Sequence, residues 1–531
     1  CILILLSWLF PIHAVPWTTF HSELLAFLSG LSLVAGLSYS EIKIPKPQIL
    51  ALPILFIPLI QWGFGQILYF SNALLCTIYI AMFWLMVVVG YNLAIGEKRK
   101  REKVFKIFCF VVYVGAIISR ISEYFSPWLN VLRGNRPYAN FAQPNNLATF
   151  ICIGLFACLY FYEKKIISNM ILISTTFIFL LTIALTQSRT AWVVCIFTFF
   201  YLMIKHFGKN RRFGFVKLLA WVGIFITLIV CLPIFNQWLV SFASQDIIQT
   251  ATVAQRASSG YLRLDIWNQA LVAITQQPWF GYGWNQTGIA QISAFDSYPS
   301  HEWYNTAHNV ILDLLIWNGI PISTIIVFFM IIWLFWLNCS VKEPVSIAAS
   351  LMVFAILIHA LLEYPIHYAY FLLPLGFLLG IIQAQYIDLS SLTLNKILLP
   401  ISLFGGVILI IIINRDYELY RKQSLIVTRG FALNDEERES FTKKIIVLDQ
   451  LRERVWWIGF NPHSKVSDQQ LEHIGRMVSN LASRYDIYKY AQVLAFNGKK
   501  AEAEHQLWVL KILHGQEKSY QDLLPISIAE K

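Results

Sequence analysis

The chain of 531 residues is 57% hydrophobic and only 13% charged, with a mean hydropathy of +0.59, whereas soluble globular domains carry roughly a quarter charged residues. The formal net charge of +11 does not indicate nucleic-acid binding, because Lys and Arg gather in short clusters between apolar runs, as is typical of membrane topology. The composition therefore excludes a soluble enzyme and a nucleic-acid-binding protein, and it predicts a polytopic protein surrounded by membrane lipids.

Apolar runs predict an all-α membrane fold with about 13 transmembrane helices, since each crossing needs about 20 apolar residues. The chain begins inside the first run without an initiator Met, so we expect the first helix to be truncated. In the run over 308–337, the sequence Asn318-Gly319-Ile320-Pro321 predicts a broken element that leads into the span. The predicted spans are 1–12, 22–38, 48–62, 68–96, 105–122, 145–162, 167–186, 190–206, 217–236, 308–337, 345–363, 366–385 and 397–413.

Basic clusters predict the orientation. They fall in alternate loops, and the side that carries such clusters is the cytoplasmic one. The N-terminus is therefore expected on the cytoplasmic side of the membrane. The clusters are Lys43 and Lys46; Lys98, Arg99, Lys100, Arg101, Lys103 and Lys106; Lys164 and Lys165; Lys205, Lys209, Arg211, Arg212 and Lys217. The loops 13–21, 123–144 and 237–307 and the tail after Ile413 are expected in the periplasm.

Composition also predicts two domains. Residues 1–413 form a transmembrane domain that includes the large loop 237–307, and residues 414–531 are polar enough for a separate soluble α-helical domain in the periplasm. Near 486–513 the pattern reads as helix, Asn497-Gly498 turn and helix, which resembles one tetratricopeptide-like hairpin.

Arginines on the predicted periplasmic side mark candidate site positions, because a cation close to a membrane span usually needs a partner or a task. Arg189 lies in a turn too short to form a solvated loop, so an anionic group at the membrane surface is its natural partner. The structural alternative is an arginine that extends to a lipid phosphate. The arginines on this side are Arg133, Arg136, Arg189, Arg256 and Arg263.

His308 is the candidate proton acceptor. It ends the large loop and is followed at once by an apolar run, so it is expected at the membrane surface, where a neutral imidazole can take a proton near neutral pH. A surface histidine bonded to a nearby carbonyl is the alternative. A metal site is not predicted, because His301, Glu302 and His308 lack metal-ligand spacing and the eight cysteines form no CxxC pair.

Further polar residues interrupt apolar surroundings near the same predicted face. Gln143 and Asn146 lie at the mouth of one span and Tyr364 at the mouth of another, where amides and a phenol can bind sugar hydroxyls or phosphate oxygens. Capping of proline-bearing helix ends is the alternative for each. The turn Gly281-Tyr282-Gly283 would let backbone approach a ligand closely.

Several of these motifs, taken in order, resemble one family. The chain is similar over almost its whole length to the O-antigen ligase and polymerase superfamily, and within it to the PglL-type protein O-oligosaccharyltransferases. The motifs are Pro11-Ile12-His13 with Pro16 to Glu23, Ala142-Gln143-Pro144-Asn145, Ser188-Arg189-Thr190, Arg263 with Trp267, Pro278 with Gly281-Tyr282-Gly283, Ala307-His308-Asn309 with Leu312 and Gly319, and Glu363-Tyr364-Pro365.

The resemblance implies a GT-C-like fold and transfer of an oligosaccharide from a polyprenyl-diphosphate carrier to Ser or Thr hydroxyls of an acceptor protein such as pilin. It implies inversion at the anomeric carbon. Transfer without a metal is expected from the residues themselves, because Asp265, Asp296, Glu302 and Glu363 are not spaced as a DxD pair, and no cofactor is predicted. His308 is then the expected base, with Arg189 and Arg263 clamping the diphosphate. The expected substrate-binding residues are Gln143, Asn146, Tyr364 and Arg136.

Two alternatives remain open. An O-antigen ligase or polymerase would use the same donor with lipid A-core or a glycan as acceptor. A transporter of lipid-linked glycans would need charged residues along a path through the membrane. Here the candidates gather at one predicted face, and few ionisable groups lie deep in the spans apart from Asp313 and His359, so transfer is favoured over transport.

Overall fold

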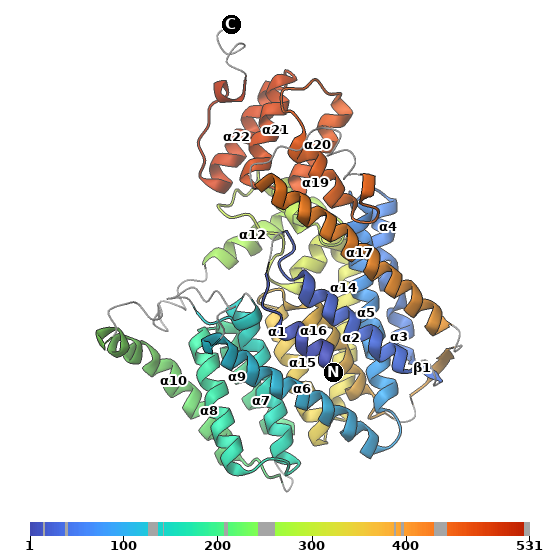
Figure 1. The fold of residues 1–531 in the computed structure, drawn as a ribbon, viewed down its shortest axis with the longest axis vertical. Helices are drawn as coiled ribbons and strands as arrows, with labels where there is room; N and C mark the ends of the chain where they lie inside the picture. The colour runs from blue at the N-terminus through green and yellow to red at the C-terminus, as the bar shows by residue number, and fades with distance from the viewer. Residues whose placement is uncertain are drawn as a thin grey trace. The chain divides into compact units, whose positions relative to one another are not determined.

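The computed structural model describes residues 1–13, 16–37, 41–125, 136–141, 143–205, 211–242, 261–386, 389–394, 398–428 and 443–524 (Figure 1). Nearly all of their regular structure is helical. The described strands are β1 (Ile42–Pro45) and β2 (Ser391–Leu394), which pair antiparallel with Ile42 opposite Leu394. The predicted all-α polytopic class is confirmed.

Eight described helices are long and apolar enough to cross a membrane, and each coincides with a predicted span. The shorter apolar helices α15 (Pro344–Ala360) and α16 (Ala369–Gln383) also follow predicted spans, as do α1 (Ile2–Leu9) and α9 (Arg189–Lys205). The eight long helices are α2 (Phe20–Leu37), α5 (Phe70–Ala94), α6 (Lys98–Phe125), α7 (Pro144–Glu163), α8 (Asn169–Thr186), α10 (Phe215–Phe242), α14 (Val310–Cys339) and α17 (Leu398–Thr428).

Two of the predicted spans are interrupted. The span expected over 48–62 is divided into α3 (Lys46–Ala51), the 3₁₀ helix η1 (Leu52–Phe56) and α4 (Ile57–Gly63). Prolines recur through this stretch, and each removes a backbone donor and clashes with the preceding turn. Helix α14 is broken at Gly319, whose φ of 71° and ψ of 174° are not helical, as the Asn-Gly-Ile-Pro sequence predicts.

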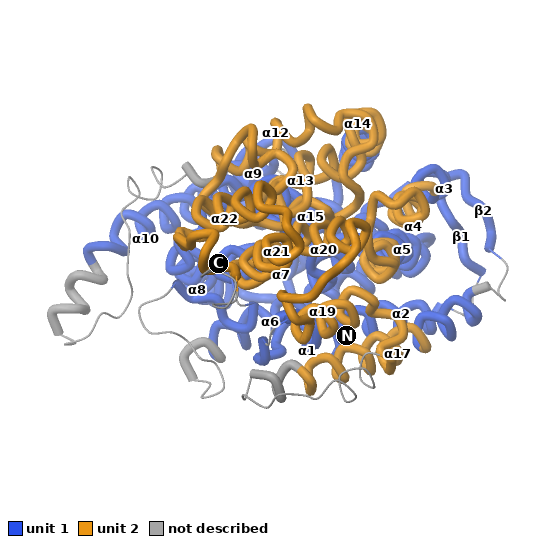
Figure 2. The backbone as a smooth tube through the Cα atoms, turned by 90° about the horizontal axis from the view of Figure 1, so that it is seen from above, with its two compact units in different colours: residues 1–52, 79–260, 330–407 blue, residues 53–78, 261–329, 408–531 orange. Residues whose placement is uncertain are grey.

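The chain divides into two compact units, coloured separately in Figure 2. Unit 1 contains residues 1–52, 79–260 and 330–407, and unit 2 contains residues 53–78, 261–329 and 408–531. In this division the polar tail shares unit 2 with part of the large loop and with the start of α14. The domain boundary at Ile413 stays a prediction.

In unit 1, α7 forms the centre of the helix packing. It contacts α6, α8, α9 and α15, and 94% of its spanning window is buried. Helices α5 and α16 approach so closely that Cβ atoms added at Gly90 and Gly380 would lie 2.2 Å from the backbone oxygens of Phe377 and Val87. Small residues at such contacts let membrane helices pack through their backbones.

The C-terminal part of unit 2 is a helical bundle. It contains α19 (Asp449–Gly459), α20 (Asp468–Asn480), α21 (Arg484–Phe496) and α22 (Lys500–His514). Helix α20 begins with a capping box between Ser467 and Gln470, and Gly498 turns the chain between α21 and α22 with φ of 80°. Trp457 is completely buried among these helices, and its Nε1 donates to Asp486.

The same bundle packs against the part of the large loop that precedes His308. This part includes α12 (Tyr261–Gln276) and α13 (Thr287–Ala294). Phe295 is fully buried, and its ring meets the edge of Trp508 with 5.4 Å between centroids. His505 Nε2 lies 2.7 Å from Asp296, and the His301 ring lies 3.2 Å from the carbonyl of Ile512. The loop and the C-terminal helices are therefore one packed body.

Candidate functional site

All seven predicted site residues lie within the described part of the chain, and they are divided between the two units. Arg136, Gln143, Asn146, Arg189 and Tyr364 belong to unit 1, and Arg263 and His308 belong to unit 2. Arg133 and Arg256, two further arginines of the predicted periplasmic loops, lie outside the described residues. Each group is described by itself below.

In unit 1, Glu363 organises a hydrogen-bonded group that we call the Glu363 network. Its carboxylate is 5% exposed and accepts from Gln143 Nε2 and Asn145 Nδ2, each at 2.9 Å. Asn145 Oδ1 in turn accepts from Arg136 Nη2 at 3.1 Å, and Arg136 Nε donates to the carbonyl of Thr186. The Asn145 amide nitrogen thus donates to the Glu363 carboxylate, and its oxygen accepts from the Arg136 guanidinium. These two hydrogen bonds fix the orientation of the amide.

The contact continues one helical turn along α7 and α15. Thr149 lies four residues after Asn145 on α7. His359 is in the last turn of α15, and its carbonyl accepts from the amide of Glu363, which follows the end of that helix. The Thr149 hydroxyl lies 2.9 Å from His359 Nδ1, and both side chains are buried. Polar contacts therefore join the first turns of α7 to the last turn of α15 and to the residues that follow it.

Arg189 begins α9 directly after a tight turn. Gln187 ends α8 in the left-handed region with φ of 51°, and Arg189, which is half-buried, is the first residue of α9. Arg136 donates to the carbonyl of Thr186, just before this turn, so Arg136 and Arg189 both lie at the α8–α9 connection. Two cations beside a helix N-terminus favour an anion such as a phosphate.

Two buried polar side chains lie close in sequence to these groups. Asn146, in the first turn of α7, is 1% exposed, and neither atom of its amide has a hydrogen-bond partner within the described residues. The hydroxyl of Ser188, beside Arg189, is also buried and has no such partner in the described part of the chain. Buried polar groups normally bind something, so each is available to a ligand or a water molecule.

Tyr364 follows Glu363 and is half-buried at the start of the 3₁₀ helix η3 (Pro365–His367). Its ring lies 5.9 Å from those of His367 and Tyr368. Burial raises the pKa of Tyr364 above its usual value, and the negative charge of Glu363 raises it further. Tyr364 therefore remains a neutral phenol that can donate a hydrogen bond.

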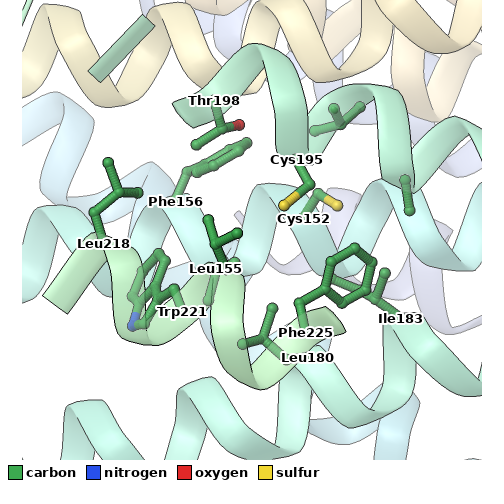
Figure 3. Close-up of a pocket in the computed structure, with 13 residues that line it drawn as sticks. Cys152, Leu155, Phe156, Leu180, Ile183, Cys195, Thr198, Leu218, Trp221 and Phe225 are labelled. Atoms are coloured by element: carbon green, nitrogen blue, oxygen red, sulfur yellow. The ribbon is translucent and has the colours of Figure 1, made fainter. Parts of the chain in front are cut away.

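Helix α9 also lines an apolar pocket in unit 1, shown in Figure 3. Ala191, Val194, Cys195 and Thr198 follow one face of α9, starting half a turn after Arg189. The pocket has a volume of about 40 Å³, and its lining is almost entirely apolar. It suits hydrocarbon and not the hydroxyl-rich surface of a glycan. The remaining lining residues are Cys152, Leu155, Phe156, Leu180, Ile183, Leu218, Trp221, Val222 and Phe225.

In unit 2, His308 sits in an unusual backbone conformation. Its φ is 54°, in the left-handed region that residues other than Gly seldom adopt. The next residue, Asn309, caps α14 by accepting from the backbone amides of Ile311 and Leu312 at 3.0 and 3.3 Å. The half-buried imidazole thus lies one residue outside a capped helix N-terminus.

Asp313 anchors the loop just before His308. Its carboxylate is 1% exposed and accepts from the Thr306 hydroxyl at 2.7 Å, the Ala307 amide at 2.8 Å and the Thr287 hydroxyl at 2.9 Å. Sequence reasoning noted Asp313 only as an acid inside a span. The usable signal was its position, five residues after the histidine in the first turn of α14.

Arg263 is brought near the same loop by α12. Trp267 Nε1 donates to the carbonyl of Ala307 at 3.0 Å, so this face of α12 lies against the residue before His308. Arg263, which is half-buried, precedes Trp267 by four residues and therefore shares its face. The structure thus brings Arg263 and His308 into one neighbourhood.

The Gly281-Tyr282-Gly283 turn serves a packing role. The backbone amides of Tyr282 and Gly283 donate to carbonyls of Ile316 and Trp317 at 2.8 and 3.0 Å. A Cβ atom at Gly281 would lie 2.4 Å from the Ile316 oxygen, and φ there is 67°. The close approach predicted for a ligand is made instead to α14, beside its break at Gly319.

Comparison with known proteins places the chain in a family. The profile described as "O-Antigen ligase" matches residues 174–322, and the profile described as "Virulence factor membrane-bound polymerase, C-terminal" matches residues 347–524. A protein of Acinetobacter baylyi named "General O-oligosaccharyltransferase" is 40% identical, with 98% of this chain and 93% of that protein covered. A second A. baylyi protein, "ComP-specific O-oligosaccharyltransferase", is 32% identical, with 77% of this chain and 76% of that protein covered.

The first protein is similar over the helices, the histidine loop and the C-terminal bundle alike, so the relation extends to the complete set of elements described above. Both relatives carry the name of the same glycosyl-transferring activity, and the first profile covers the Arg189 turn, Arg263 and His308. The chain is a multi-pass membrane glycosyltransferase, and it belongs to the protein O-oligosaccharyltransferases of the O-antigen ligase superfamily.

Proposed function

We propose that the chain transfers an oligosaccharide from a polyprenyl-diphosphate carrier to Ser or Thr hydroxyls of periplasmic proteins, pilins among them. One relative is named as general and the other as specific for ComP, and the general one is the more similar over a larger share of the chain. This difference supports a broad acceptor range. The acceptor is protein, whereas O-antigen ligases and polymerases would use lipid A-core or a glycan.

The observation that carries the proposed chemistry is the conformation of His308. A left-handed non-Gly backbone costs on the order of 1 kcal/mol or more and persists where the surroundings impose it, often at functional sites. In the proposed step, the acceptor hydroxyl loses its proton to His308 while its oxygen attacks the anomeric carbon. The bond from that carbon to the diphosphate breaks, the polyprenyl diphosphate leaves, and single displacement inverts the anomeric centre.

Arginines are proposed to hold the departing diphosphate. Arg189 and Arg263 are the clamp, because guanidinium groups bind phosphate oxygens through two parallel hydrogen bonds. Arg136 lies at the Thr186 end of the Arg189 turn and is proposed to join the substrate-binding residues. The buried amide of Asn146 and the phenol of Tyr364 are proposed to bind sugar or phosphate. Gln143 is proposed to act with Glu363, to which it donates.

The proposed topology follows the basic clusters. The protein is placed in the bacterial inner membrane with its N-terminus in the cytoplasm, and the histidine loop and C-terminal bundle in the periplasm. Packing between that loop and the bundle supports a common side for both. The proposed domains remain 1–413 and 414–531, with the tetratricopeptide-like hairpin at α21 and α22.

Purified enzyme given one lipid-linked glycan and a choice of acceptors tests this function. We expect glycan on Ser or Thr of a pilin or another periplasmic protein, detected as a mass increase on the acceptor peptide. Lipid A-core and free glycan should remain unmodified. Transfer to lipid A-core alone would identify a ligase, and growth of the glycan chain would identify a polymerase.

Chelation of divalent cations should leave transfer intact, because the arginines are proposed to neutralise the diphosphate. Within the described residues, no three His, Cys, Asp or Glu side chains converge closely enough to hold a metal ion. The acids near the loop already have partners: Asp265 accepts from Tyr298 at 2.8 Å, and Asp296 pairs with His505. The initial rate in excess EDTA is expected to match the untreated rate. A rate lost in EDTA and restored by Mg²⁺ or Mn²⁺ would contradict the arginine clamp.

A further inference from the structure

The contacts around His308 assign a role to a residue outside the proposed reacting set. We propose that Asp313 is a positioning residue, which acts through Thr306 and Ala307 to hold the His308 backbone in the left-handed conformation. The inference rests on the proposed role of His308 as the base. Asp313 itself is not proposed to touch substrate.

The first step of the argument is the connection from Asp313 to the His308 backbone. The Thr306 hydroxyl donates to Asp313 Oδ2 at 2.7 Å and accepts from the His308 amide at 3.1 Å. The hydroxyl is thus a bridge, with its one proton used on the carboxylate and a lone pair used on the histidine amide. With the start of α14 held in place, rotating His308 about φ would move its amide away from the Thr306 hydroxyl and break the second of these bonds.

The second step is the connection through the neighbouring amide. Asp313 Oδ1 accepts from Ala307 N at 2.8 Å, while the Ala307 carbonyl accepts from Trp267 Nε1 at 3.0 Å. The peptide units on both sides of Ala307 are therefore fixed, one by the carboxylate and the other by α12. His308 is the next residue, so its orientation is determined from its N-terminal side.

The third step concerns the other end of His308. Asn309 caps α14, and the amide of Asp313 donates to the carbonyl of Asn309 at 2.9 Å as part of the first turn. His308 thus lies between a fixed loop and a fixed helix start, with Asp313 bonded to both. A strained residue held from both sides keeps its conformation without substrate, which is the arrangement a preorganised base requires.

The position of Asp313 is itself determined by α13. Thr287, the first residue of α13, is fully buried, donates to Asp313 Oδ1 at 2.9 Å, and accepts from Trp317 Nε1 at 2.8 Å. Asp313 also lies in the first turn of α14, where a negative charge is favoured by the helix dipole. The buried Asp313 carboxylate is therefore stabilised by its hydrogen bonds and by the dipole of α14.

A histidine displaced by about 1 Å is expected to lose on the order of 10²-fold in rate, because proton transfer depends on hydrogen-bond distance. The donor is proposed to bind through its diphosphate and sugar to side chains other than Thr306 and Asp313. Removing the hydrogen bonds of Asp313 should therefore lower kcat and leave KM for the lipid-linked donor nearly unchanged. A residue needed only for folding would reduce the amount of active enzyme and its Tm without this separation.

The experiment compares Thr306→Val with Thr306→Ser in the full-length purified enzyme. Val keeps the shape of Thr but removes the hydroxyl bridge, whereas Ser keeps the hydroxyl. We expect kcat of Thr306→Val to fall by about 10-fold to 10²-fold with donor KM within about threefold of the wild type. Thr306→Ser should keep kcat close to the wild-type value. Thr275→Val is the matched control, since Thr275 is exposed and its hydroxyl donates to the carbonyl of Val272 in its own helix.

Asp313→Ala extends the test by removing the acceptor of Thr287, Thr306 and Ala307, and it should lower kcat further. Equal kcat values for Thr306→Val and Thr306→Ser, or a raised donor KM at constant kcat, would overturn the positioning role.

Should Thr306→Val fail to fold, Thr287→Val and Thr287→Ser make the same comparison for the hydrogen bond that α13 donates to the Asp313 carboxylate. Equal kcat values for those two variants would overturn the positioning role too. A fully active His308→Asn enzyme would instead remove the proposed base. An inactive His308→Asn with a fully active Thr306→Val removes the positioning role alone.

Discussion

Replacing His308 with Asn is expected to lower kcat by about 10²-fold to 10⁴-fold, the usual contribution of a general base. Asn is chosen because it tolerates the left-handed backbone that His308 occupies better than Ala does. The variant therefore removes the proton acceptor and keeps the local fold. Donor KM should change little, since a base acts on the transition state and not on donor affinity. Kinetics with purified enzyme, lipid-linked donor and acceptor peptide measure both parameters.

His301→Ala is the control for this result. His301 belongs to the same loop and is exposed, and its ring Nδ1 lies 3.2 Å from the carbonyl of Ile512. Its loss should leave kcat near the wild-type value. His308→Gly provides a second check, because Gly adopts the left-handed region without strain. A low rate in the Asn and Gly variants alike assigns the defect to the missing imidazole, and normal turnover in either would eliminate His308 as the base.

Replacing Arg189 or Arg263 with Lys is expected to reduce kcat/KM for the donor by about 10-fold to 10²-fold each. Lys keeps the positive charge but lacks the planar fork that binds two phosphate oxygens at once. The missing second hydrogen bond corresponds to a few kcal/mol at most, because hydrogen bonds to charged groups contribute about 1.5–3 kcal/mol. The measurement is the donor dependence of the initial rate at fixed acceptor.

Matched controls separate this effect from charge and topology. Arg99→Lys on α6 and Arg452→Lys on α19 make the same change at exposed positions, one in each unit, and should keep wild-type kcat/KM. Wild-type kcat/KM in both the Arg189→Lys and Arg263→Lys enzymes would mean that these arginines contact lipid or set topology. A reduction in only one of them would assign the diphosphate to that residue alone.

The helices of this protein were readable from the sequence because apolar run length is a local property. Helix α7, for example, follows the predicted span 145–162 closely. The stretch over 48–62 was apolar enough to count as a span, yet Pro53 and Pro58 divide it. The length of an apolar run could not predict this division, because it depends on composition alone and not on the backbone hydrogen bonds that proline removes.

The candidate residues were also readable, but their contacts were not. Gln143 and Glu363 are separated by 220 positions, and their 2.9 Å hydrogen bond depends on how α7 and α15 pack. The sequence around Gly281 does not indicate that this residue packs against α14. A glycine permits close approach of another group, but it does not specify which group that is. Whether the seven candidates act on one substrate, as the resemblance implies, stays a prediction.

Asp313 illustrates what pattern reading could not reach. An acid in an apolar run indicates function in general, but the groups that donate to the Asp313 carboxylate include residues of α13 and of the loop before His308. Only the folded chain places Thr287, Thr306 and Ala307 around one carboxylate. The left-handed backbone of His308 is equally invisible in the sequence, because histidine more often occupies ordinary regions.

The packing of the C-terminal bundle on the loop before His308 bears on how the enzyme matures. His301 touches Ile512, 211 positions later, and Asp296 pairs with His505, 209 positions later. The ribosome synthesises the chain from the N-terminus, so the loop is made before the C-terminal helices that pack on it. The spans before the loop would already be inserted in the bilayer before Trp508, which packs against Phe295, is synthesised. Catalytic competence should therefore be among the last properties the nascent protein acquires, which leaves a partly synthesised transferase inert toward its donor.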